Sequence, residues 1–167
     1  MGYYLSLPAL ILAAALQSSL MGQLRIAGGA PDLVLILVLL WSIHAPLNEA
    51  IFWAFVGGIT LDLLSVIPLG SSVMGMLIMI YLIKRLSVQL FHINIVLVAG
   101  FLLLGTVIQI TVTHLILAFR GFGLSPGDVF QYVMLPELFY HLVLFLPIYI
   151  VIRGLQQRLY PEPGTRL

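Results

Sequence analysis

The chain has 167 residues, of which 62% are hydrophobic and 8% are charged, and its mean hydropathy is +1.17. A water-soluble domain of this length cannot bury so large an apolar fraction. The net charge of +1, from scattered Lys and Arg, argues against a nucleic-acid partner, and the absence of cysteine excludes disulfides and thiolate sites. We therefore expect an integral protein of the lipid bilayer without a cofactor.

Six apolar segments predict an all-α fold, a compact bundle of six transmembrane helices that forms one integral membrane domain over residues 1–167. Their expected ranges are 4–24, 31–45, 47–64, 71–90, 93–119 and 129–155. The first segment lacks the basic start of a signal peptide, so we expect it to be retained. The second is short for a span of about 20 residues, so we expect it to pack inside the bundle.

Basic residues near the segment ends predict the orientation in the membrane, because they accumulate in cytoplasmic loops. With six spans, one side carries Lys84, Arg85, Arg153, Arg158 and Arg166, and the other side carries Arg25 and Arg120. Both termini are therefore expected in the cytoplasm. Trp41 and Trp53 lie near segment ends, where an aromatic belt at the membrane interface is expected.

The third segment carries a row of residues at four-residue intervals: Ala50, Ala54, Gly58 and Asp62. Residues at this spacing share one face of a helix, and the first three are small enough for another backbone to approach. Packing within the chain and docking of a partner helix are both compatible with this row.

Asp62 lies near the end of the third segment and is followed by SVIPLG, in which Pro68 and Gly70 indicate a tight reversal. The N–H groups of such a turn need acceptors at membrane depth. We expect the Asp62 side chain to accept them, a role that needs an oxygen but no charge. An ion or proton site and a contact with another protein remain the alternatives.

Two further polar groups have local interpretations. Glu137 and His141 lie one turn apart on the sixth segment and can hydrogen-bond each other, next to the carbonyl that Pro136 leaves free. Asp32 can pair with Arg25 across the first loop or cap the N-terminus of its own helix. Neither group identifies a ligand.

Two stretches, GAPDLVLILVLLWSIHAP and FVGGITLDLLSVIPLG, resemble the paired signatures of the MreD family of bacterial rod-shape-determining membrane proteins. That pattern has a Pro and a polar residue opening a Leu-rich helix, then G-x-x-x-D-L-x-S with a nearby L-G. Leu63 and Leu69 complete the match. The residues expected to serve helix packing, partner contact or the structural motif are Pro31, Asp32, Ala54, Gly58, Asp62, Ser65, Pro68 and Gly70.

The resemblance implies a non-catalytic component of the complex that synthesises peptidoglycan during elongation of rod-shaped bacteria, located in the inner (plasma) membrane. The implied partners are the single-span protein MreC, the MreB filament, a SEDS glycosyltransferase and a penicillin-binding transpeptidase. Family members also resemble, in their six-helix fold, the substrate-binding subunits of energy-coupling-factor transporters.

That second likeness supplies the alternative function, a small-solute or vitamin-binding transporter subunit. Ala9 and Ala13 form a row that resembles the one through which such subunits dock their coupling partner, although similar rows are common in membrane helices. A solute pocket also needs convergent polar residues. The candidates are too dispersed in the sequence to predict a pocket: Asp32, Asn94, Gln109 and His114.

An enzyme is the third class considered. The sequence contains neither the H-E-x-x-H motif of metalloproteases nor the G-x-S-x-G nucleophile elbow. Ser71 or Ser72 would need His92, His114 or His141 as a base, and a cap for the fourth helix is the simpler role for these serines. We expect no catalytic, cofactor-binding or metal-binding residue.

Overall fold

The computed structural model describes residues 2–21, 31–87 and 94–159, with side chains for 7–19, 31–87 and 94–155. They form α1 (Gly2–Met21), α2 (Leu33–His44), α3 (Leu47–Leu63), α4 (Ser71–Ser87), α5 (Ile95–Phe119), α6 (Pro126–Asp128), the π-helix η1 (Val129–Met134) and α7 (Leu135–Leu159). No strand occurs among the described residues, which confirms the all-α prediction. The last expected segment contains η1 and most of α7 in one continuous helical stretch.

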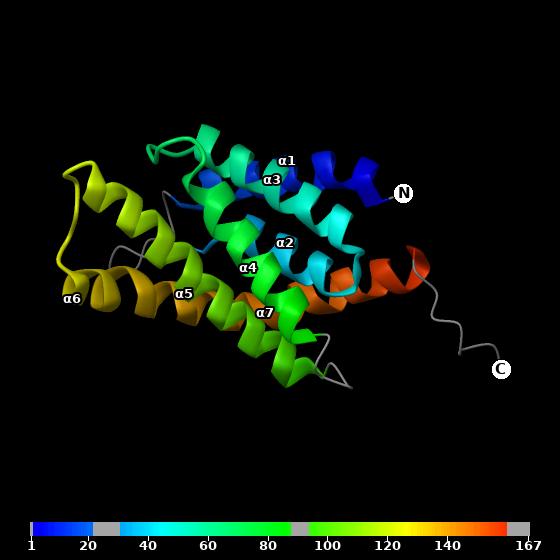
Figure 1. The fold of residues 1–167 in the computed structure, drawn as a ribbon. Coiled ribbons are helices and arrows are strands. Elements are labelled where there is room, and N and C mark those ends of the chain that lie inside the picture. The colour runs from blue at the N-terminus through cyan, green and yellow to red at the C-terminus, as the bar shows by residue number, and fades with distance from the viewer. Residues whose placement is uncertain (1, 22–30, 88–93, 160–167) are drawn as a thin grey trace.

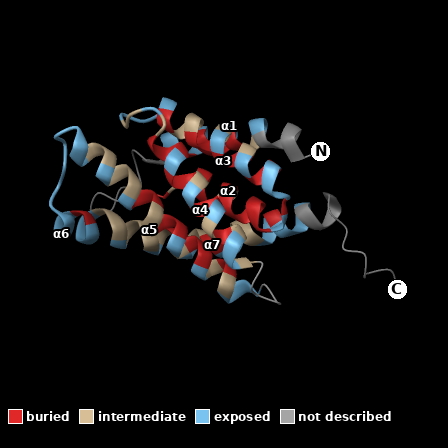
Figure 2. Cartoon of the chain, in the orientation of Figure 1, coloured by how far each residue is buried: buried red, intermediate tan, exposed pale blue. Residues whose placement is uncertain are grey.

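Helix α2 lies at the centre of the bundle and contacts α1, α3, α4, α5 and α7. In Figure 1, α1 and α3 run along one side of α2, and α5 and α7 run along the other. Nine residues between Val34 and Ile43 are buried, and most of α2 is red in Figure 2. The expectation that this short segment packs inside the bundle is confirmed.

The C-terminal end of α2 is fixed by a proline and by a lysine from α4. Ala45 adopts an extended conformation (φ −70°, ψ 151°), as expected for a residue that precedes Pro46. The Nζ of Lys84 donates to the carbonyl oxygen of Ala45 at 2.6 Å and to that of Ile43 at 3.3 Å. The lysine thus satisfies carbonyls that the helix end leaves unpaired.

The expectation that Trp41 and Trp53 belong to an interfacial belt is wrong. Both side chains are almost fully buried, and their rings stack with centroids 4.5 Å apart. The indole Nε1 of Trp41 donates to Oε1 of buried Glu49 at 2.8 Å. Because α2 is surrounded by other helices, both rings gain contacts inside the bundle, and the N–H of Trp41 satisfies the buried carboxylate there.

Large apolar side chains are exposed on the peripheral helices. They include Leu12 on α1, Phe55 on α3, Ile78 on α4, Leu104 on α5 and Ile150 on α7. So much exposed apolar surface indicates contact with lipid or protein. Among the described residues, two helical stretches are long and apolar enough to cross a membrane, Ile95–Phe119 and Pro126–Leu155, whereas Leu7–Ser19 and α2 are shorter apolar helices.

Candidate functional site

The Asp62 carboxylate holds the turn between α3 and α4. Its side chain is 2% exposed. Oδ2 accepts the backbone N–H of Gly70 at 2.6 Å, and Oδ1 accepts that of Ser72 at 3.2 Å. Gly70 has a φ of +94°, a conformation that favours glycine. These bonds are the geometry that the expected acceptor role requires. In the same turn, the N–H of Ser65 binds the carbonyl of Asp62 at 3.3 Å, and the N–H of Ser71 binds that of Pro68 at 3.1 Å.

The serines at the start of α4 do not cap it, contrary to expectation. The Oγ of buried Ser71 has no hydrogen-bond partner, and the N–H of Ser72 is bound by Asp62. The N–H of Ser72 is satisfied by a carboxylate of the preceding helix and that of Ser71 by the carbonyl of Pro68 at 3.1 Å, so these groups need no cap from the serine hydroxyls.

The row of small residues on α3 faces the chain's own helices. Ala50 and Ala54 are fully buried, and a Cβ on Gly58 would lie 2.6 Å from the backbone N and Cα of Val73 in α4. Such a distance is shorter than real Cβ contacts, so α3 and α4 approach this closely only with glycine at position 58. The row contributes to packing within the chain and leaves no exposed surface for a partner helix.

Side chains from three helices satisfy the N-terminus of α2, which follows the buried Pro31. Asp32 is the N-cap, and its Oδ1 accepts the N–H of Leu35 at 2.9 Å. Gln17 of α1 accepts the N–H of Val34 at 3.3 Å, and Nε2 of His141 of α7 accepts the N–H of Asp32 at 3.0 Å. Of the two roles considered for Asp32, the capping bond is present, whereas Arg25 lies outside the described residues.

His141 is fully buried and connects three helices. Because its Nε2 accepts a hydrogen bond, the proton of the neutral ring lies on Nδ1. Nδ1 is 2.6 Å from Oγ1 of Thr106 in α5, and that hydroxyl donates to the carbonyl of Leu102 at 2.9 Å. One arrangement of protons therefore satisfies the imidazole and the hydroxyl together. His141 was a candidate from the sequence, whereas no sequence signal indicated Thr106 or Gln17.

The hydrogen bond considered between Glu137 and His141 is not formed. Oε1 of Glu137 is 4.0 Å from Nε2 of His141, which is beyond hydrogen-bonding distance. The nitrogen is already used by the N–H of Asp32. The neighbouring backbone is also irregular: η1 ends with the N–H of Leu135 bonded to the carbonyl of Phe130, just before Pro136. Single π-helical turns within α-helices occur frequently at functional sites.

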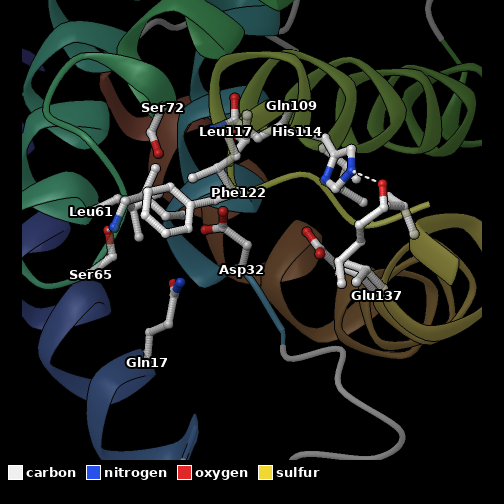
Figure 3. Close-up of a pocket in the computed structure, with 16 residues that line it drawn as sticks. Gln17, Asp32, Leu61, Ser65, Ser72, Gln109, His114, Leu117, Phe122 and Glu137 are labelled. Carbon is white, nitrogen blue, oxygen red and sulfur yellow. Dashed lines mark hydrogen bonds between the residues drawn. The ribbon is translucent and has the colours of Figure 1, made fainter. Parts of the chain in front are cut away.

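A cavity of about 350 Å³ lies where α1, α3 and α5 end and where α2, α4 and α7 begin. Figure 3 shows side chains from these helices converging on it. The volume falls within the range of about 300–1,000 Å³ typical of small-molecule sites. Its polar lining includes Gln17, Asp32, Ser65, Ser72, Gln109, Thr113, His114 and Glu137.

This cavity corrects the expectation that the polar residues are too dispersed to form a pocket. Asp32, Gln109 and His114 line it together, because antiparallel helices bring distant residues to the same end of the bundle. Asn94 is the exception: it N-caps the opposite end of α5 by accepting the N–H of Leu97 at 2.9 Å.

The alanine row on α1 is not available for docking in this structure. Ala13 is 5% exposed, and Ala9 is partly buried against the same hydrophobic core. The row therefore packs inside the chain, which removes the feature that resembled a transporter docking surface.

The histidines considered as bases are not paired with the candidate serines. Nε2 of His114 lies 3.1 Å from the carbonyl oxygen of Leu124, shown as the dashed line in Figure 3, and both ring nitrogens of His141 have the partners described above. His92 lies outside the described residues. Within the described ranges, no group of three or more His, Cys, Asp or Glu side chains is suited to a metal ion.

Comparison with known proteins gives one match. The sequence profile of the family described as rod shape-determining protein MreD matches residues 1–159. No curated protein and no solved structure matches the chain significantly. The family match covers the α3–α4 turn, the capped start of α2 and all helices of the bundle. The chain belongs to the MreD family of rod shape-determining proteins, which are membrane proteins of the cell envelope.

Proposed function

We propose that the chain is a non-catalytic component of the bacterial cell-elongation complex and acts by binding partner membrane proteins such as MreC. The family match over residues 1–159 carries this proposal. The MreB filament, a SEDS glycosyltransferase and a penicillin-binding transpeptidase are the further partners that family membership implies. The exposed apolar side chains on α1, α3, α4, α5 and α7 are compatible with contacts to lipid and to partner helices.

The proposal includes a single membrane domain over residues 1–167 with six spans. Successive long helices alternate in direction, since the cavity is lined by the ends of α1, α3 and α5 and by the starts of α2, α4 and α7. The 17 residues of α3 and of α4 correspond to about 25 Å of helix, close to the bilayer's hydrocarbon thickness of about 30 Å. Helix α2 is shorter, but its neighbours shield it from lipid.

Charge supports an orientation with both termini in the cytoplasm. Lys84, Arg85 and Arg153 lie near the C-terminal ends of α4 and α7, at one end of the bundle, whereas Arg120 follows α5 at the other end. Basic residues favour the cytoplasmic side. The cavity would then open toward the outer side of the inner membrane.

Single cysteines at two positions test this orientation, because the chain has no cysteine of its own. Ser87→Cys should react with a membrane-impermeant maleimide only after the cells are permeabilised, whereas Gly123→Cys should react in intact cells. Labelling of both positions from the same side would contradict the six-span arrangement.

The functional proposal is tested by complementation and copurification. In a rod-shaped bacterium depleted of its own MreD, expression of this chain with the MreC of its source should restore rod shape. A tagged chain should copurify with MreC from native membranes. A chain that accumulates in the membrane, yet neither restores shape nor recovers MreC, would overturn the proposal.

The cavity is the observation that favours the alternative, a solute-binding subunit of an energy-coupling-factor transporter. The buried Ala9 and Ala13 row counts against it, because the feature that would dock a coupling partner is internal. The two functions predict different copurifying proteins: a single-span protein for the elongation complex and a pair of ATPases for the transporter. A neighbouring gene for MreC or for such ATPases gives the same discrimination.

A further inference from the structure

The cavity is lined by two carboxylates, Asp32 and Glu137. No lysine or arginine is among the described residues that line it. Oδ1 of Asp32 caps α2, and the ion-pair contact of Glu137 is the 4.0 Å approach to His141. Carboxylates removed from bulk water are stable when a cation or hydrogen-bond donors compensate them. The lining therefore favours a positively charged occupant.

Gln109 supplies an independent indication that the cavity binds a ligand. Its side chain is 5% exposed, and its Oε1 has no hydrogen-bond partner. Buried polar atoms in native proteins are seldom left unpaired. Gln109 lines the cavity, and in this structure its Oε1 lies against Gly75 of α4. Rotation about the terminal side-chain torsion, which has broad minima, can direct the oxygen to a donor in the cavity.

The remaining walls indicate an apolar part of the ligand. Ile110 and Leu117 of α5, Leu124 of the following loop and Val133 of η1 line the cavity. Phe122 also lines it although it is 75% exposed, so the cavity reaches the protein surface at the loop between α5 and α6. Pockets that bind small molecules combine such apolar walls with a few convergent polar groups.

We infer that the cavity binds a small organic ammonium compound, with the charged nitrogen between Asp32 and Glu137 and the apolar part against the walls from α5 and η1. Gln109 contributes a further acceptor to the ammonium group or to a hydroxyl of the ligand. This inference goes beyond the proposed role in cell elongation. Ligand binding is measured on the purified protein, so a failure of this inference is distinguishable from a failure of the shape assay.

Three probes that differ in one group test the charge requirement. Tyramine carries an ammonium group, tyrosol replaces it by a hydroxyl, and 4-hydroxyphenylacetate replaces it by a carboxylate. We expect calorimetric titration of the protein in lipid nanodiscs to detect tyramine, with tyrosol and the carboxylate at least about tenfold weaker. Cadaverine, an aliphatic diamine, tests whether the aromatic ring is needed. Equal binding of tyramine and tyrosol, or no binding of either amine, would overturn the inference.

Variants of the protein locate the site. Glu137→Gln should weaken tyramine binding about tenfold, because it removes one charge from the lining. Asp128→Asn is the matched control, since Asp128 is an exposed acid of α6 that does not line the cavity, and it should leave binding unchanged. Val133→Phe fills the cavity and should abolish binding even if Glu137→Gln does not fold.

Two results would refute this location. Unchanged affinity in both Glu137→Gln and Val133→Phe would place any amine binding elsewhere. If Arg25→Gln created tyramine binding that the parent protein lacks, the chain's own arginine would compensate the carboxylates, and the inference of an external ligand would be wrong.

Discussion

Substitution of Asp62 tests how the α3–α4 turn is stabilised. The two N–H groups that Asp62 binds use separate carboxylate oxygens, Oδ2 for Gly70 and Oδ1 for Ser72. Asp62→Ala removes both acceptors. The N–H of buried Ser72 is left unpaired at a cost of about 1–3 kcal/mol, and the N–H of half-buried Gly70 loses its bond at a cost of about 0.5–1.5 kcal/mol. The sum is a large part of a typical unfolding free energy of about 5–15 kcal/mol. We expect the alanine variant to accumulate poorly in the membrane.

Asp62→Asn should lie between the parent and the alanine variant. The sequence suggested that an oxygen without charge suffices, but asparagine has one carbonyl oxygen and places its NH₂ group where the second carboxylate oxygen stood. It can retain one of the two bonds and sets a donor against the other backbone N–H. The expected order of stability is therefore Asp, then Asn, then Ala.

Denaturant-induced unfolding of the purified protein measures this order, and shape rescue with checked membrane levels measures its consequence. Asp128→Asn is the control, because that side chain is exposed and the amide oxygen can still accept the Ser125 hydroxyl, so the unfolding free energy should change by less than about 0.5 kcal/mol. An Asp62→Ala protein as stable as the parent would refute the turn-capping role. An Asn variant that is stable yet as inactive as Ala would instead assign Asp62 to a charged contact or an ion site.

Two further pairs of variants test the packing. Gly58→Ala should destabilise the protein by about 1–3 kcal/mol, because the new Cβ meets the backbone of Val73. Gly100→Ala, whose Cβ would have no atom within 4 Å, should be neutral or stabilising. Equal effects of the two substitutions would contradict the close approach of α3 and α4. Thr106→Val should cost about 1–3 kcal/mol by leaving the imidazole N–H unpaired, whereas Thr111→Val on the exposed face of α5 should cost less than about 0.5 kcal/mol in the same unfolding assay.

Features that depend on local sequence were predictable. The six apolar segments correspond to helices because each is long, apolar and bounded by turn residues. The length of the second segment indicated its central position, because it has too few residues for a free-standing span. Asp62 was identifiable as an acceptor, since an acid followed within one turn by SVIPLG meets the N–H groups of that reversal.

Features that depend on contacts between distant residues were not predictable. His141 binds Asp32 and Thr106 across large separations in sequence, and no periodicity within α7 indicates those partners. The cavity is likewise formed by residues from Gln17 to Glu137. The tryptophans were assigned to the membrane interface by their positions along the segments, whereas burial depends on which helix lies at the centre of the bundle.

The polar contacts near the cavity matter more in a membrane than their small number suggests. Many large side chains of α7 are exposed, and lipid provides little hydrophobic drive to press such a helix against its neighbours. The bond between His141 and the N–H of Asp32 therefore helps to set the register of α7 against α2. Glu137 lies one turn from His141 and faces the cavity across from Asp32. A cation held by both carboxylates would join α7 to α2 beside that bond, so ligand binding and the position of the most exposed helix are expected to be coupled.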